Sequence, residues 1–269
     1  IYSQLNCQHP AYEKLFPDAF QYYQNAIQDN NFTCIVSKNT MDKIGKNLVE
    51  NSVSNIIHIK DSITFWDLTE MLPKDIPVII VSAGPSLNRN VEVLKQAKGK
   101  SIIMAVDKAY ITLLRHDIEP DFVVTLDAVK PLSSCGNKAG FTTPLLCLLE
   151  GSQQILKNHA GRKVIYDCSE FMRRIYEELG KKMIEVSSGG SVSTSAFALC
   201  ALARFRRIVL VGSNLAYDGG ASHARAEYSA HEKDDAFELY VDDIEGNKIR
   251  TRYDWYTFLR WYEAAILQM

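Results

Sequence analysis

A glycine and two serines follow an apolar run near residue 80, in an order suited to holding an anion. The run Val78–Val81 leads directly into Ser-Ala-Gly-Pro-Ser, and a helical pattern follows. Gly84 lets the backbone approach a ligand, Pro85 fixes φ at the helix entry, and Ser86 can cap free N–H groups. The other N–H groups and the helix dipole favour phosphate there. The order matches neither the dinucleotide-binding fingerprint nor the P-loop, and an ordinary capped turn is the alternative interpretation.

A second turn of the same kind lies near residue 189. Ser188, Gly189, Gly190 and Ser191 separate an expected strand at residues 183–186 from an apolar helical stretch. Glycines and hydroxyls again stand between a strand end and a helix N-terminus. Two such turns in one sheet predict a ligand with a phosphate and a polar body, lying across the crevice between them.

Two carboxylates are expected at the same edge of the sheet. Asp107 follows the apolar run Ile102–Val106, and Asp127 follows a run at residues 122–126. Carboxylates in these places could bind Mg²⁺, accept hydrogen bonds from ribose hydroxyls, or act as a base. Capping of the following helix is the alternative for each of them.

The polar loop after Ile208–Val211 supplies further candidates. Asn214 can donate and accept hydrogen bonds to a base or sugar, and Tyr217 lies in the same loop. A histidine in such a loop can titrate near neutrality, so His223 is the predicted general base and His231 the alternative. No His-x-x-x-His or similar spacing occurs, so no metal site is predicted.

The elements that must position these residues are short apolar runs that alternate with helical stretches. The runs are Val78–Val81, Ile102–Val106, 122–126, 145–149, 163–166, 183–186 and Ile208–Val211. This alternation predicts a parallel sheet covered on both faces. We therefore expect an α/β fold with a Rossmann-like, doubly wound, mostly parallel sheet.

The two ends of the chain differ from this pattern. Residues 1–74 are expected to form an α-rich preface, with one strand candidate at residues 34–36, and residues 75–269 to form the Rossmann-like domain. Near the C-terminus, residues 239–241 and 248–250 flank Glu-Gly-Asn, which predicts a hairpin. A helix from about Asp254 closes the chain.

Composition narrows the function classes. The chain of 269 residues has a formal net charge of −2, so no overall basic field would hold a nucleic acid. The 6 cysteines include no C-x-x-C pair, which argues against a zinc knuckle and fits reduced thiols in the cytoplasm. No apolar run approaches the roughly 20 residues that a membrane span needs.

Three blocks of the chain, residues 81–95, 105–128 and 187–224, closely resemble the central domain of motility-associated factor proteins. A fourth block, residues 239–266, resembles the hairpin and helix that follow this domain in the same family, and all four blocks come in the same order. This domain is also named 6-hydroxymethylpterin diphosphokinase MptE-like, and it is similar, more distantly, to bacterial sialyltransferases that use a CMP-sugar. Motility-associated factors are bacterial enzymes that attach nonulosonic acids to Ser and Thr of flagellin.

The resemblance implies that residues 75–269 form a nucleotide-sugar-binding domain, and it implies roles for several residues. The turn at residues 84–86 would hold the nucleotide phosphate, and the turn at residues 188–191 would contribute to the donor site. Asp107 falls where the sialyltransferases have an asparagine. Family members commonly have an aspartate where this chain has Asn214, so nucleotide contact fits this position better than a catalytic or metal role.

The implied reaction is inverting transfer of a pseudaminic, legionaminic or sialic acid-like sugar from a CMP-sugar donor to flagellin. It needs no obligatory metal cofactor, and His223 and Asp107 are the catalytic candidates. One alternative is an ATP-dependent pterin diphosphokinase, which would recruit Mg²⁺ through Asp107 and Asp127. Another is a non-catalytic nucleotide-sugar-binding module.

Overall fold

The computed structural model describes residues 9, 11–135, 140–224 and 238–269. Contacts divide the chain into two compact units, residues 1–46 and 47–269. The first unit contains α1 (Tyr12–Leu15) and most of α2 (Pro17–Asn55), whose last turns belong to the second unit. Residues 34–36 are helical, so the strand expected there is wrong: three β-favouring residues do not interrupt a helix of 39 residues. No helix in the described ranges is long and apolar enough to cross a membrane.

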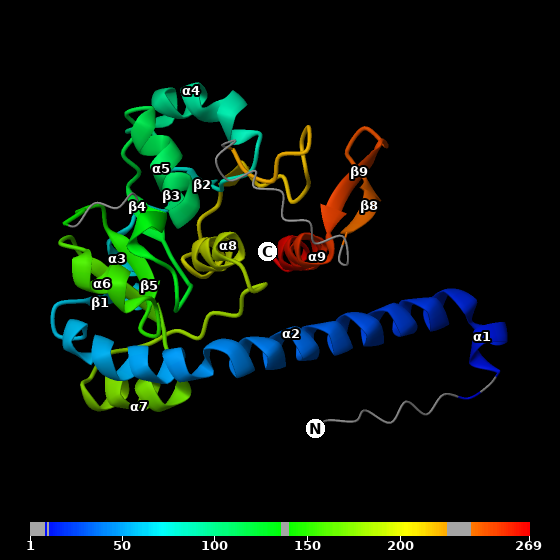
Figure 1. The fold of residues 1–269 in the computed structure, drawn as a ribbon, viewed down its shortest axis with the longest axis horizontal. Coiled ribbons are helices and arrows are strands. Elements are labelled where there is room, and N and C mark those ends of the chain that lie inside the picture. Colours follow the sequence, from blue (N-terminus) through cyan, green and yellow to red (C-terminus); the bar gives the residue numbers. More distant parts are fainter. Residues whose placement is uncertain (1–8, 10, 136–139, 225–237) are drawn as a thin grey trace. The chain divides into compact units, whose positions relative to one another are not determined.

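Seven strands form one sheet in the order β1-β6-β5-β4-β3-β2-β7, and every neighbouring pair is parallel (Figure 1). The strands are β1 (Ile63–Thr64), β2 (Val78–Val81), β3 (Ile102–Val106), β4 (Phe122–Val124), β5 (Leu145–Leu148), β6 (Lys163–Asp167) and β7 (Ile208–Val211). The predicted parallel α/β sheet is confirmed. Because β1 precedes residue 75, the sheet extends into the expected preface, and the functional division at residue 74 stays a prediction.

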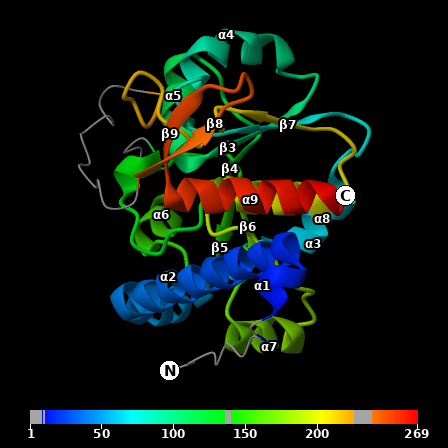
Figure 2. The ribbon, with the colours of Figure 1, turned by 90° about the vertical axis from the view of Figure 1, so that its right-hand side faces the viewer.

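Helices cover both faces of the sheet (Figures 1 and 2). One face carries α4 (Leu87–Ala97), α5 (Asp107–Arg115), α6 (Gln153–Asn158) and α7 (Glu170–Glu178), and the other carries α3 (Phe65–Met71), α8 (Val192–Leu202) and α9 (Tyr253–Leu267). Successive strand residues alternate between these layers, so Ile80 packs in the layer of α8 while Ile79 and Val81 pack in the layer of α4.

The order of the strands changes direction at β2. From β2 to β6 each strand is added on the same side, and the chain then returns through α8 to place β7 on the other side of β2. Val81 therefore pairs with Ala105 of β3 and with Val211 of β7. Ligands of open α/β sheets bind at such a switch point, beyond the carboxyl ends of the strands.

The strand expected at residues 183–186 does not form. Both edges of β6 are already paired, one with β5 and the other with β1. The backbone N–H of Val186 instead donates to Asp167 Oδ2 at 3.1 Å, and Ile184 packs against the core. The segment contributes apolar side chains without joining the sheet.

The predicted hairpin and closing helix are present. Strands β8 (Glu238–Asp242) and β9 (Lys248–Arg252) pair antiparallel, and α9 begins directly after β9. Thr251 Oγ1 donates to the carbonyl oxygen of Leu215, and the N–H of Tyr217 donates to that of Arg250 at 3.0 Å. These bonds attach β9 to the loop that follows β7.

Candidate functional site

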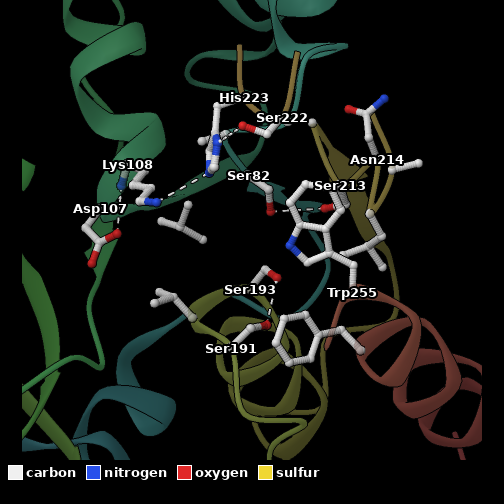
Figure 3. Close-up of a pocket in the computed structure, with 18 of the residues that line it drawn as sticks. Ser82, Asp107, Lys108, Ser191, Ser193, Ser213, Asn214, Ser222, His223 and Trp255 are labelled. Atoms are coloured by element: carbon white, nitrogen blue, oxygen red, sulfur yellow. Dashed lines mark hydrogen bonds between the residues drawn. The ribbon is translucent and has the colours of Figure 1, made fainter. Parts of the chain in front are cut away.

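A cavity of about 250 Å³ lies beyond the carboxyl ends of β2, β3 and β7 (Figure 3). It is lined by residues 82–84, 106–108, 191–193, 212–216 and 222–223, with Lys130, Trp255 and Phe258. Five predicted site residues line it: Gly84, Asp107, Ser191, Asn214 and His223. The switch point of the sheet therefore brings together segments that are far apart in the sequence.

Gly84 joins the loops that follow β2 and β7. Its N–H donates to the carbonyl oxygen of Gly212 at 2.7 Å. A Cβ atom at Gly84 would lie 2.3 Å from that oxygen and 2.5 Å from Asn214 Oδ1. The close approach of these two loops thus requires a glycine whether or not a ligand is bound.

Ser86 does not cap α4 with its side chain, so that prediction is wrong. Its backbone is already helical, with φ −64° and ψ −17°, whereas a capping residue is normally extended. Instead the Ser86 hydroxyl donates to Asn214 Oδ1 at 2.7 Å. Neither Pro85 nor Ser86 is among the residues that line the cavity.

The second turn presents a hydroxyl to the cavity and uses its glycines for packing. Ser191 is extended and caps α8 through reciprocal hydrogen bonds with Thr194. Gly189 packs against α9, where a Cβ would lie 2.7 Å from Trp261 Cγ, and Gly190 has φ +87°. Ser191 lines the cavity, but Ser188, Gly189 and Gly190 do not.

Asp107 is a buried carboxylate that holds a lysine. Its side chain is 1% exposed, and Oδ2 lies 2.6 Å from Lys130 Nζ. The same oxygen accepts from Thr125 Oγ1 at 2.9 Å, and Oδ1 accepts from the N–H of Lys108 at 2.7 Å. The carboxylate is therefore at the predicted edge and already accepts hydrogen bonds from three protein donors.

Asp127 has a different environment from Asp107. Its Oδ1 accepts from the N–H of Val129 at 3.0 Å, and it does not line the cavity. Of the two carboxylates that could have shared a Mg²⁺ ion, only Asp107 therefore lines the cavity. Among the described residues no group of three or more His, Cys, Asp or Glu side chains is arranged to hold a metal.

His223 lines the cavity between two polar partners (Figure 3). Its Nε2 lies 3.4 Å from Lys108 Nζ, and its Nδ1 lies 2.9 Å from Ser222 Oγ. An ammonium can only donate, so with a charged Lys108 the Nε2 atom accepts and Nδ1–H donates to Ser222. His231, the alternative base, lies outside the described residues.

Aromatic residues of α9 form one side of the cavity. Trp255 and Phe258 line it, and the Tyr217 ring lies 5.0 Å from that of Trp255 between centroids. The Arg250 guanidinium lies 4.1 Å from the Tyr217 ring centre. Tyr217 does not line the cavity and supports Trp255 instead. The three-residue spacing of Trp255 and Phe258 on a helix was the available sequence signal.

The described cysteines other than Cys34 are buried core residues. Burial raises the pKa of Cys135, Cys147, Cys168 and Cys200 to about 12 in each case. Such thiols stay protonated at neutral pH and are poor nucleophiles. These four cysteines are therefore not candidates for a catalytic nucleophile.

A larger hollow of about 940 Å³ lies elsewhere, between α8 and α9. It is lined mainly by apolar residues such as Phe197, Leu202 and Trp261. None of the predicted site residues lines it. This hollow is the larger of the two, but the predicted site residues line the smaller cavity at the switch point, which is therefore the candidate site.

The fold and the cavity define a Rossmann-like α/β domain. Its topological switch point holds a site lined by polar side chains that include two lysines. The chain belongs to the 6-hydroxymethylpterin diphosphokinase MptE-like family, whose model matches residues 46–220. Its structure is similar to that of MAf glycosyltransferase from Magnetospirillum magneticum AMB-1, with a TM-score of 0.53 and 20% sequence identity. That match covers 72% of this chain and 31% of the other, and it shows the fold. No curated protein matches the sequence.

Proposed function

We propose that this chain is a glycosyltransferase that binds a CMP-activated nonulosonic acid in the cavity beyond β2, β3 and β7. The observation that carries the proposal is the arrangement inside that cavity. Lys108, Lys130 and the N-terminus of α8 supply positive charge for a phosphate, and His223 supplies a base in the same space. The likeness in fold to a MAf glycosyltransferase supports the same reaction class.

The reaction would be an inverting displacement. The acceptor hydroxyl oxygen attacks the anomeric carbon, and its proton passes to His223. The bond from that carbon to the phosphate oxygen breaks, and the electron pair leaves with CMP. Fixed positive charge in a partly enclosed site stabilises the leaving phosphate, so a metal ion is not an obligatory part of the proposal.

The organic part of the donor would lie on the aromatic side of the cavity. Trp255 and Phe258 offer apolar faces on which a base or sugar ring can pack. Asn214 lines the same space and can bond to polar edges of such a ring. Flagellin is the proposed acceptor. The chain spans 31% of the length of the solved relative, so the acceptor-binding surface need not lie within it.

The family description favours one alternative, a pterin diphosphokinase. That reaction transfers a diphosphate from ATP, and it normally relies on Mg²⁺ to neutralise the phosphates. Of the two carboxylates expected to bind this ion, Asp127 does not line the cavity and Asp107 is paired with Lys130. This geometry favours the transferase.

Nucleotide binding and turnover test the proposal. Thermal unfolding would be followed with CMP, CTP, ATP and GTP, each with and without Mg²⁺. We expect stabilisation by CMP that does not depend on Mg²⁺, and release of CMP when CMP-nonulosonic acids are mixed with flagellin. His223→Gln should lower the transfer rate by about 10²- to 10⁴-fold and leave CMP binding nearly unchanged. Stabilisation by ATP alone, only with Mg²⁺, would identify the kinase instead.

A further inference from the structure

Two lysines bring positive charge into the cavity, and sequence motifs gave no indication of either. Lys130 Nζ lies 2.6 Å from Asp107 Oδ2, and the lysine side chain is 12% exposed. Lys108 directly follows Asp107 and places its Nζ 3.4 Å from His223 Nε2. Both lysines line the cavity together with Asp107.

The contacts of Asp107 fit a positioning role better than that of a base. Its oxygens accept hydrogen bonds from Lys130, from Thr125 and from the backbone of Lys108. With three donors and 1% exposure, the carboxylate has little capacity left to accept a proton from a substrate. What it does is fix the Lys130 ammonium at the edge of the cavity.

Both lysines bring an ammonium group to the same small space. The described lining of the cavity contains these two lysines and one carboxylate, that of Asp107, although the whole chain has a formal net charge of −2. A charge that is partly shielded from water interacts strongly with a nearby counter-charge. Lysines at such a place are suited to phosphate, which they bind as point charges.

We propose that Lys108 and Lys130 form the phosphate subsite of this cavity and that Asp107 is the residue that positions Lys130. The identity of the nucleotide rests on the function proposed above, but the subsite itself does not. When a phosphate binds, Lys108 turns toward it from His223. The Nε2 atom of His223 is then available to accept the proton of the acceptor hydroxyl.

The subsite acts on the bond that breaks. As the bond between the anomeric carbon and the phosphate oxygen breaks, its electron pair remains on that oxygen. The phosphate changes from a diester with one negative charge to a monoester that carries up to two. Two ammonium groups stabilise the product more than the bound donor, and this difference lowers the barrier.

Paired ligands with and without a phosphate test the subsite. Isothermal titration would compare CMP with cytidine, and ATP with adenosine, on the wild type, Lys108→Met, Lys130→Met and the exposed control Lys100→Met. We expect each cavity substitution to weaken binding of the phosphorylated ligand by about tenfold or more and to leave the nucleoside unaffected. Lys108→Met keeps the buried Asp107–Lys130 pair, so it carries the test if Lys130→Met does not fold.

A double-mutant cycle isolates the role of Asp107. If Asp107 acts through Lys130, Asp107→Asn should weaken CMP binding in the wild type and have no further effect in Lys130→Met. Equal losses for CMP and cytidine, or unchanged CMP binding in both lysine variants, would overturn the subsite. A wild type that binds ATP but not CMP would reject the transferase. The lysine variants would then be tested by comparing ATP with adenosine. A wild type that binds no phosphorylated ligand would reject both.

Discussion

Asn214 Oδ1 accepts two hydrogen bonds from Ser86, one from the backbone N–H at 3.0 Å and one from the hydroxyl at 2.7 Å. Ser86 follows β2, and Asn214 follows β7. The amide oxygen therefore joins the two loops that meet at the switch point of the sheet. These two donors belong to the turn that the resemblance assigned to the nucleotide phosphate, and they are already bonded within the protein.

Substitutions of Asn214 should separate these two roles. Asn214→Leu removes the acceptor and leaves two donors unsatisfied, so we expect a loss of about 1–3 kcal/mol in the free energy of unfolding. Asn214→Asp keeps an acceptor in place and should fold normally. It also adds a negative charge to the lining of the cavity, so CMP should bind more weakly. Denaturant titration and calorimetry measure the two effects, and a Leu variant as stable as the wild type would contradict this account.

Gly84 should be intolerant of any side chain because of protein neighbours. A Cβ there would lie 2.3 Å from the backbone oxygen of Gly212, which cannot move without displacing β7. Gly84→Ala should lower the free energy of unfolding by about 1–3 kcal/mol or more. The matched control is Gly45→Ala in α2, where the nearest atom is Met41 Cε at 3.5 Å. Equal melting temperatures for both variants would show that the loops adapt.

The last turns of α2 are bonded to the loops that hold Lys130. The Asn51 side-chain NH₂ donates to the carbonyl oxygens of Ala128 and Glu150, both at 2.9 Å. Ser152 completes the arrangement by donating from its hydroxyl to the carbonyl oxygen of Lys130 at 2.6 Å. A buried amide of the helix thus fixes the loop at residues 127–130, from which Lys130 reaches Asp107.

Asn51→Asp should disturb this loop. It replaces an NH₂ group by an oxygen that faces two carbonyl oxygens, at a site that is 4% exposed. We expect a loss of about 2–4 kcal/mol in stability and weaker CMP binding, since Lys130 loses its support. Hydrogen exchange should rise at residues 127–130 and 149–152. Asn39→Asp, on an exposed part of the same helix, is the control, and the proposal fails if the two variants exchange alike.

The sequence could locate the edge of the site because one rule governs it. Residues that directly follow parallel strands gather beyond the carboxyl ends of those strands, and this rule placed Gly84, Asp107 and Asn214. The same rule applies to Lys108, which directly follows Asp107 and also lines the cavity. The apolar runs that alternate with helical stretches likewise predicted that helices cover both faces of the sheet.

Other features of the fold and the site depend on tertiary packing, which local sequence patterns do not reveal. Lys130 enters the cavity from a loop that other segments hold, and Trp255 arrives on a helix that follows the hairpin. The segment at residues 183–186 has the composition of a strand, yet β1 occupies the edge of β6 that it would need. Ser86 has the right side chain for a cap but a helical backbone, so its hydroxyl finds another acceptor.

His159 should make stability depend on pH. Its Nε2 donates to the carbonyl oxygen of Thr143 at 2.9 Å, while Nδ1 is buried without a hydrogen-bond partner. Burial lowers the pKa of His159 to about 4, and the nearby Lys163 ammonium acts in the same direction. A proton on Nδ1 would have no acceptor in the folded protein, whereas the unfolded chain takes up this proton near the ordinary pKa of about 6.5.

The sign of the effect follows from the two protonation states. Between pH 6.5 and pH 4 the unfolded chain binds a proton at His159 that the folded protein does not, so folding loses stability as the pH falls through this window. Above pH 6.5 the contribution is fully present. His159→Gln keeps a donor for Thr143 and cannot titrate, so its free energy of unfolding should fall less steeply, by up to about 1.4 kcal/mol per pH unit. Urea titrations at several pH values measure the slopes, with His9→Gln as the exposed control. Parallel slopes for His159→Gln and the wild type would contradict this account, because they would mean that His159 has the same pKa in the folded and the unfolded protein.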